Sequence, residues 1–168
     1  MTEPLPIYLD HNATTPVDPA VRDAMWPFFT EIFGNPSSVE HVHGARAQAA
    51  VNKARETIAD VLGARGNEII FTGSCTEANN LAILGAARAR PEKRHVITSA
   101  VEHPAVLEPM RRLEAEGFEI TRLPVNEFGQ VTVNAVVLAI RDGTGLVSIM
   151  GANNEVGSTN PIAEIGAA

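Results

Sequence analysis

The sequence predicts an α/β fold with a mostly parallel sheet and helices on both faces. From about residue 64 onward, short strand-like segments alternate with longer helix-like segments, and connections of only a few residues separate them. Parallel strands joined by crossing helices produce this order. The chain has 168 residues, of which 45% are hydrophobic and 20% are charged, and this is enough to form a folded core.

Helices are expected before this alternation begins. Asp18-Pro19 is typical of a helix N-cap and first helical position, so we expect a helix over residues 20–33 that bends or breaks at Pro27. Residues 45–62 carry apolar side chains at three- and four-residue steps, which predicts an amphipathic helix, and Gly63 follows as a stop signal. Between these two segments, the residues GNPSSVEHVHG predict a loop.

The remaining segments supply the sheet and its cover. Strands are expected at 68–72, 94–98, 119–123 and 145–150, with a further short strand at 7–10. Helices are expected at 76–88, 105–116 and, less typically because of its valines, 133–140. Asn160 and Pro161 predict the capped start of another helix, which is then cut short. From that short helix we expect the chain to be the N-terminal portion of something longer.

Composition and charge argue against several functional classes. The formal net charge of −7 does not favour a nucleic-acid partner, and no apolar run is long enough to span a bilayer, so we expect no membrane partner. The start MTEPLPIYLD lacks the regions of a secretory signal, and a single cysteine fits a reducing cytosol, so we expect a cytoplasmic location. His41 and His43 stand without a carboxylate or cysteine cluster, so no metal site is expected.

Small and polar residues follow the predicted strands. Ligands of open parallel sheets bind beyond the carboxyl ends of the strands, so these residues form a candidate site. In chain order, the segments are HNATT, GSCTE, SAVEH and GANNEVG.

The turn at residues 73–77 leads into a predicted helix, whose unpaired N–H groups and positive end favour a phosphate. The alternative is a helix capped by Thr76, with Asn79 in the capping-box position and no ligand. Cys75 lies where a helix dipole favours a reactive thiol, but a small buried cysteine that fills the turn is the simpler interpretation.

Two further candidates come from the later strand ends. His103 can transfer protons near neutral pH, or its ring can lie against a planar ligand, and the alternative is a capping or surface histidine. Asn153 and Asn154 can offer a carboxamide to a hydroxyl group or oxyanion of a ligand, and the alternative is an Asx turn.

Five segments together resemble the cysteine desulfurases, which are pyridoxal-phosphate (PLP) enzymes of the class V aminotransferase group with the type I PLP fold. In matching order and spacing, they are YLDHNATTPVDP, FGNPSS, EIIFTGSCTEANNLAI, VEHPAVL and LVSIMGANNEVG. The resemblance runs from about residue 7 to residue 168. It implies an incomplete large domain plus an N-terminal part of the small domain. Residues 1–16 would form a strand and loop at the substrate edge, residues 17–63 helices and the GNPSS loop, and residues 64–168 the first part of the PLP-binding domain.

The resemblance also implies roles for particular residues. Cys75 and Thr76 would lie at the phosphate of PLP, His103 would stack on the ring and move protons, and Asn154 would bind the ring hydroxyl group. The segments beside the substrate pocket and the dimer interface would contain Asn12, Ala13, Thr14, Asn35 and Ser37. The implied reaction converts L-cysteine to L-alanine. Its sulfur passes to an enzyme persulfide and then to an acceptor or scaffold protein of iron–sulfur cluster assembly.

The chain departs from this family in two respects. It has GSCTE where SGATE or SCGTE is frequent, and a phosphate site built from backbone N–H groups tolerates that change. The family's PLP-binding lysine, pyridinium aspartate and catalytic cysteine are missing, because Lys53 and Lys93, the only lysines, are expected on the surface. We therefore expect the chain alone to be inactive, and we expect a homodimer or a complementing C-terminal chain.

Three other interpretations stay open from the sequence. The first keeps the fold and changes the reaction to that of a selenocysteine lyase or another class V enzyme. The second is a non-catalytic remnant that binds a partner or dimerises. The third is a generic phosphate-binding α/β module, which rests on residues 73–77 alone.

Overall fold

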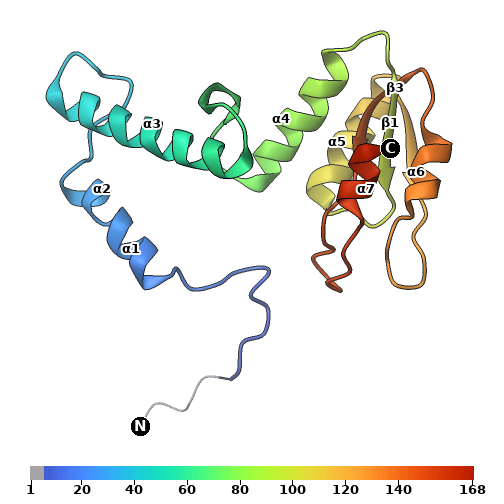
Figure 1. Cartoon of the computed structure of the whole chain (residues 1–168), viewed down its shortest axis with the longest axis horizontal. Helices are drawn as coiled ribbons and strands as arrows, with labels where there is room; N and C mark the ends of the chain where they lie inside the picture. Colours follow the sequence, from blue (N-terminus) through green and yellow to red (C-terminus); the bar gives the residue numbers. More distant parts are fainter. Residues whose placement is uncertain (1–5) are drawn as a thin grey trace. The chain divides into compact units, whose positions relative to one another are not determined.

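The computed structural model describes residues 6–168, which form two compact units that divide after Phe71. The first unit contains the helices α1 to α3, and the second contains the sheet with its helices (Figure 1). The first five residues of the predicted segment 1–16 lie outside the described residues. The division into segments 1–16, 17–63 and 64–168 stays a prediction.

The first predicted helix is broken where the sequence indicates. Helix α1 covers Pro19–Met25 and helix α2 covers Pro27–Thr30, so α2 ends before residue 33, the predicted end of the helix. The carboxylate of Asp18 caps α1 by accepting the Ala20 N–H at 2.7 Å. The break falls at Pro27 because proline has no N–H to continue the helical hydrogen bonds.

Helix α3 covers Val42–Leu62 and begins three residues before the predicted start at residue 45. The early start has a local cause, since His41 Nδ1 accepts the N–H of Gly44 at 3.1 Å and so caps the first turn. At the other end, Gly63 adopts a left-handed conformation with φ of 64°, which confirms the predicted stop.

Two strands predicted in this unit are wrong. Residues 7–10 form no strand, and Ile7 and Leu9 are 88% and 86% exposed. Residues 66–68 form a short 3-10 helix, η1 (Gly66–Glu68), and residues 69–72 are extended without a partner strand. Arg55 on α3 holds this segment instead, because its Nη1 donates to the Ile69 carbonyl at 2.6 Å and its guanidinium lies over the Phe71 ring.

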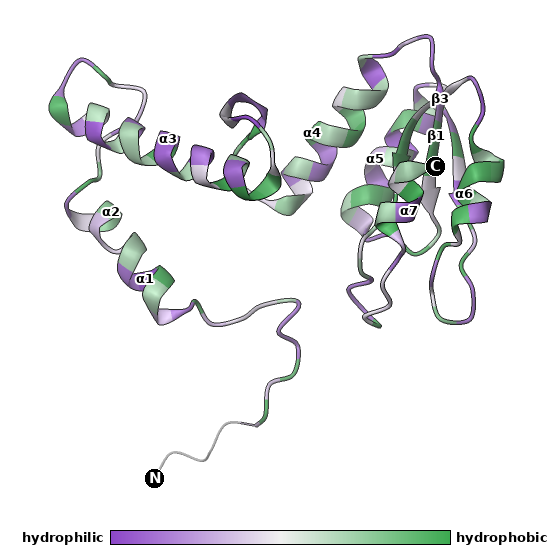
Figure 2. Cartoon of the chain, viewed as in Figure 1, coloured by the Kyte–Doolittle hydropathy of each residue, from purple (hydrophilic) through white to green (hydrophobic). Residues whose placement is uncertain are grey.

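The second unit contains a parallel sheet with the strand order β2-β1-β3. Strand β1 covers His95–Ser99, β2 covers Glu119–Leu123 and β3 covers Thr144–Ser148, each close to its predicted range. Strand β1 pairs with both neighbours in parallel, and all five of its residues are buried. In Figure 2, which colours the chain by hydropathy, the hydrophobic residues of β1 are Val96 and Ile97 at its centre. A parallel α/β arrangement is therefore confirmed.

Helices cover both faces of this sheet, as predicted. Successive side chains of a strand point to opposite faces, and Val96 packs with helices α4 and α5 while Ile97 packs with helices α6 and α7. Helix α4 covers Cys75–Arg88 and α5 covers Pro104–Ala115. Helix α6 covers Val133–Ala139 and α7 covers Ile162–Ala167, and all four agree with the predicted helical segments to within a few residues.

The predicted cap of the last helix is wrong. Pro161, and not Asn160, is the N-cap of α7. The Asn160 side chain is 8% exposed and is used elsewhere, since its Oδ1 accepts the Val131 N–H at 2.8 Å and its Nδ2 donates to the Met150 carbonyl at 2.9 Å. Its long-range partners therefore replace the local capping role.

His95 joins all three strands at the amino edge of the sheet. The ring is 3% exposed, with Nδ1 2.8 Å from Thr144 Oγ1 on β3 and Nε2 2.8 Å from Thr121 Oγ1 on β2. Burial lowers the pKa of the His95 imidazole, and the nearby Arg141 charge lowers it further, while Glu119 acts in the opposite direction.

We expect the stability of the second unit to fall as the pH drops below about 6.5, the ordinary pKa of histidine. The unfolded chain binds the His95 proton more readily than the folded chain, so stability is retained above that pH and lost below it. Urea unfolding at a series of pH values, compared with His95→Gln, measures this contribution, and an NMR titration of the ring provides the direct check. A folded-state pKa at or above 6.5 for His95 would contradict the expectation.

Candidate functional site

The first turn of α4 is an exposed group of unpaired backbone donors. Ser74 is the N-cap of the helix, and its hydroxyl group accepts the Glu77 N–H at 3.1 Å. The Gly73 N–H donates to Glu77 Oε2 at 2.7 Å. The N–H groups of Ser74, Cys75 and Thr76 donate to no other atom of residues 6–168, so these three are available to an anion at the positive end of the helix.

This geometry corrects two alternatives drawn from the sequence. Thr76 does not cap α4, and Asn79 does not close a capping box, because Ser74 and Glu77 make those contacts two residues earlier. Cys75 is exposed and does not fill the turn as a buried residue. Its sulfur lies 3.8 Å from Asn79 Nδ2 on the same helix.

His103 follows β1 and begins α5. It is exposed, and its Nδ1 accepts the Ala105 N–H at 3.0 Å, which makes it the N-cap of that helix. The capping alternative is therefore confirmed, but it leaves Nε2 and both faces of the ring available for a ligand. Because Nδ1 accepts a hydrogen bond, the proton of the neutral ring lies on Nε2.

Asn153 and Asn154 follow β3 and have different surroundings. Asn153 is 9% exposed, and its Oδ1 accepts the Glu155 and Val156 N–H groups at 2.9 and 3.1 Å. This is the Asx turn that the sequence left open as an alternative. Asn154 lies inside the turn, is exposed, and donates from Nδ2 to Glu155 Oε1 at 2.8 Å.

The structure brings the His103 loop and the Asn154 loop together through Asn153, which the sequence offered as a candidate for ligand binding, and through Glu102, to which the sequence gave no role. Glu102 Oε1 accepts the Met150 N–H at 2.8 Å, and Asn153 Nδ2 donates to the Val101 carbonyl at 3.2 Å. A usable signal was a polar residue directly before each candidate, in the loop that follows a strand. The first turn of α4 makes no hydrogen bond to His103.

The two lysines lie in different units of the chain. Lys53 is in α3 of the first unit and is exposed. Lys93 precedes β1, so it lies at the amino end of that strand, opposite to the His103 loop. Both positions agree with the surface roles expected from the sequence.

The candidates in the first unit lie in two exposed loops. In one, the Ala13 and Thr14 N–H groups donate to the Asp10 carbonyl at 3.2 and 3.3 Å, and Thr14 Oγ1 lies 2.6 Å from the Tyr8 hydroxyl group. Asn12 occupies the same turn and is exposed. These contacts give the loop a defined local shape.

The second loop contains Asn35 and Ser37 and is packed closely against the start of α3. Asn35 Oδ1 accepts the Ser37 N–H at 2.9 Å, and the Asn35 carbonyl accepts the Ser38 N–H at 3.0 Å. A Cβ atom on Gly44 would lie 1.7 Å from the Ser38 carbonyl oxygen. The GNPSS loop can therefore keep this place only while residue 44 is glycine.

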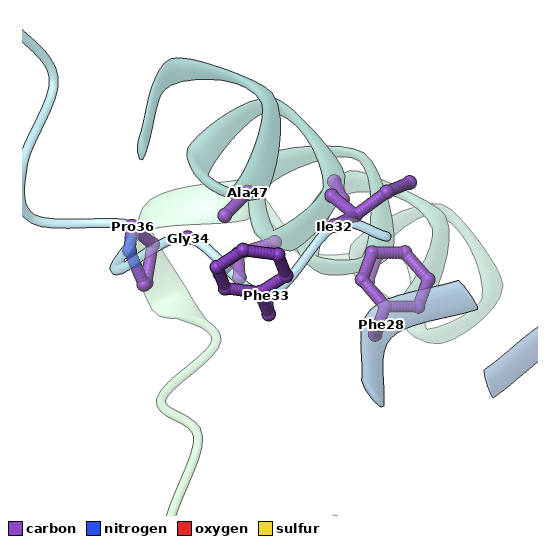
Figure 3. A pocket seen from close by; sticks show the side chains of 9 residues that line it. Phe28, Ile32, Phe33, Gly34, Pro36 and Ala47 are labelled. Carbon is purple, nitrogen blue, oxygen red and sulfur yellow. The ribbon is translucent and has the colours of Figure 1, made fainter. Parts of the chain in front are cut away.

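An apolar groove lies beside this loop, between α2 and α3. The volume of the groove is about 350 Å³. Its lining includes Phe28, Ile32 and Phe33, together with residues of α3 such as Ala47 (Figure 3). Gly34 and Pro36, the neighbours of Asn35, complete the lining. The groove offers apolar contact and no titratable group, so we assign it no chemical step.

Among residues 6–168, no group of three or more histidine, cysteine or acidic residues is arranged to hold a metal ion. Over the same residues, no helix combines the length and the apolar composition that a membrane crossing requires.

Comparison with known proteins assigns the family. The family model described as aminotransferase class V matches residues 7–168, and the chain belongs to this family. The human protein named cysteine desulfurase is 49% identical over 162 residues, which are 96% of this chain and 35% of that protein.

Two solved structures extend the comparison. A NifS-like protein matches with a TM-score of 0.92 at 40% identity, over 97% of this chain and 45% of its own. A structure of SspA in complex with cysteine matches with a TM-score of 0.88 at 43% identity, over 95% and 46%. The chain thus spans 35% to 46% of the length of these three relatives.

The residues at the site fit the phosphate and ring of PLP. Three unpaired N–H groups and the Thr76 hydroxyl group are the donors that a phosphate needs at a helix N-terminus. The exposed imidazole of His103 and the carboxamide of Asn154 can contact an aromatic ring and its hydroxyl group. Lys53 and Lys93 do not follow a strand of the sheet, so neither is assigned the covalent attachment of PLP.

We expect Gly44→Ala to destabilise the first unit by about 2 kcal/mol or more, because the new methyl group collides with the Ser38 carbonyl. Hydrogen exchange of the GNPSS loop and chemical unfolding measure the change. Gly85→Ala is the matched control, since nothing lies within 4 Å of its Cβ position in α4. That control should stabilise the chain by about 0.5–1 kcal/mol. Equal stability of Gly44→Ala and the parent chain would show that the loop is not packed as described.

Proposed function

We propose that this chain supplies the PLP-binding half of the active site of a cysteine desulfurase. The observation that carries the proposal is the group of three unpaired N–H donors at the start of α4, in a chain 49% identical to a cysteine desulfurase. A dianionic phosphate is the ligand that such a helix N-terminus favours most strongly among common biological anions.

Each candidate residue has a proposed task. Cys75 and Thr76 bind the phosphate, mainly through their N–H groups, with the Thr76 hydroxyl group as a further donor. His103 lies against the ring and moves a proton at Nε2, and Asn154 binds the ring hydroxyl group. Bound PLP supplies an electron sink for carbanion chemistry at the substrate.

The loops of the first unit border the substrate in this proposal. They contain Asn12, Ala13, Thr14, Asn35 and Ser37. The proposed substrate is L-cysteine, which the cysteine complex of SspA supports. The proposed products are L-alanine and a persulfide sulfur, which passes to an acceptor or scaffold protein of iron–sulfur cluster assembly.

A second polypeptide segment must complete the site. Lys93 lies at the amino end of β1 and Lys53 belongs to α3 of the first unit, so we propose that the lysine that binds PLP covalently comes from elsewhere. The exposed cysteine, Cys75, is placed at the phosphate, so it is not the sulfur acceptor in this proposal. We propose that a complementing C-terminal chain supplies both groups and that the chain alone is inactive.

Association of the chain is part of the same proposal. Several large apolar side chains of α1 and α2 and of the loop that follows are exposed, among them Trp26 at 62%, Phe29 at 68% and Phe33 at 69%. Such side chains favour a homodimer or a complex with the complementing chain. They also favour the second candidate function, a dimerising fragment without catalysis. The cytoplasmic location stays a proposal that rests on the single cysteine.

The first test is an absorbance spectrum of the purified chain with PLP, followed by borohydride treatment and intact mass. We expect PLP to bind without a stoichiometric pyridoxyl adduct, because neither lysine follows a strand of the sheet. Adding the C-terminal portion of a cysteine desulfurase should then produce alanine from cysteine. Lys53→Arg and Lys93→Arg serve as controls. If the parent chain forms a pyridoxyl adduct and one of these variants does not, the proposed division of the site between two polypeptides is disproved. Restored PLP binding without alanine would favour the non-catalytic candidate.

A further inference from the structure

Two buried polar side chains stand directly before the two proposed ring-binding residues. Glu102 is 6% exposed and precedes His103, and Asn153 is 9% exposed and precedes Asn154. In each pair, the first residue is buried and the second is exposed. Ring binding by His103 and Asn154 does not explain why Glu102 and Asn153 are buried.

Glu102 joins the carboxyl ends of two adjacent strands. Its Oε1 accepts the Ser99 hydroxyl group at 2.7 Å and the Met150 N–H at 2.8 Å. Ser99 is the last residue of β1, and Met150 lies two residues beyond the end of β3. Both donors are neutral, although burying a carboxylate away from a cation is unfavourable. These two hydrogen bonds therefore hold the Glu102 side chain between β1 and β3.

Asn153 makes the return contact. Its Nδ2 donates to the Val101 carbonyl at 3.2 Å, in the loop after β1, and lies 3.4 Å from the Met150 sulfur. At the same time, Oδ1 closes the turn that contains Asn154 by accepting the Glu155 N–H. One side chain thus fixes the Asn154 turn and attaches that turn to the His103 loop.

His103 is restrained from both sides as a result. On one side, Glu102 is held to β1 and β3. On the other side, Nδ1 of His103 accepts the Ala105 N–H, and α5 is anchored by the buried side chains of Val106 and Met110. The ring therefore has few orientations open to it while both contacts persist.

We propose that Glu102 and Asn153 are positioning residues, which cross between the two loops and fix the directions of His103 and Asn154. The inference rests on the proposed function, because it assumes that these two residues contact the PLP ring. The crossed pair acts on the ring end of the site only. The phosphate end consists of backbone groups of α4, which neither side chain touches.

The separation of the two ends provides the test. Pyridoxine phosphate carries the ring and the phosphate but no aldehyde, so it cannot react with a lysine. Its dissociation constant and that of inorganic phosphate are measured by titration on the 168-residue chain. We compare the parent with Glu102→Ala, Glu102→Gln and Asn153→Asp. Glutamine at residue 102 keeps an oxygen that can accept the Ser99 hydroxyl group and the Met150 N–H. Aspartate at residue 153 keeps the oxygen that closes the turn but loses the Nδ2 donor to the Val101 carbonyl.

We expect Glu102→Ala and Asn153→Asp to weaken the binding of pyridoxine phosphate about tenfold. Each variant loses a buried hydrogen bond that orients a contact with the ring. Inorganic phosphate should bind all variants alike, and Glu102→Gln should retain the parent affinity for both ligands. The control is Thr121→Val, which removes a hydrogen bond of His95 at the opposite edge of the sheet and should change neither affinity.

The possible outcomes separate the inference from the proposed function. If the parent binds pyridoxine phosphate no more tightly than inorganic phosphate, the proposed function fails, and the inference fails with it. If the parent prefers pyridoxine phosphate but the variants keep that preference, or lose both ligands equally, only the inference is overturned. If Glu102→Ala does not fold, as judged from its NMR spectrum, the comparison of Asn153→Asp with Glu102→Gln decides the question.

Discussion

The placement of β1 between two parallel neighbours is the constraint on which the rest of the second unit depends. All five residues of the strand are buried, and Val96 and Ile97 enter separate cores on opposite faces of the sheet. A strand held on both edges and both faces can shift its register only by losing both cores together. Its last residue, Ser99, therefore provides a fixed point, and the loop that carries Glu102 and His103 starts from it. The site takes its precision from this strand.

The two ends of the candidate site are built in different ways, with different tolerance to substitution. The proposed phosphate end relies mainly on backbone N–H groups of α4, so the side chain of Cys75 can vary while Ser74 and Glu77 cap the helix. The proposed ring end relies on the side chains of His103 and Asn154, which could act only when their loops are correctly placed. Buried contacts between those loops supply this placement. The departure of GSCTE from the commoner family sequences is acceptable for the same reason.

The sequence alone predicted the regular elements of the second unit well, because local period and stop signals determine them. Residues 119–123 were predicted as a strand and are one. The prediction of a strand at 68–72 was wrong because a strand also needs a partner strand, and a short stretch of sequence does not reveal whether one is present. Here Arg55 donates a hydrogen bond to the Ile69 carbonyl instead. The prediction that Asn160 caps the last helix was wrong for a related reason. The Asn160 side chain forms hydrogen bonds with Val131 and Met150, which lie outside the helix it was expected to cap. Motifs located the candidate residues, but the crossed contacts of Glu102 and Asn153 required the fold.

The energetics of this half site explain why a covalent attachment is important. Hydrogen bonds from three N–H groups to a charged phosphate contribute about 1.5–3 kcal/mol each in favourable cases. Association costs an amount of similar size, about 4 kcal/mol or more, in lost translational and rotational freedom. The first turn of α4 is exposed, so solvent weakens its contribution further. In the proposed site, backbone donors at one end of PLP would select the phosphate without holding the cofactor tightly, and ring contacts would add to the affinity only if they were already oriented. A lysine at the same edge of the sheet would make the attachment durable. If a complementing chain supplies that lysine, as proposed, selection and retention of the cofactor depend on different polypeptide segments.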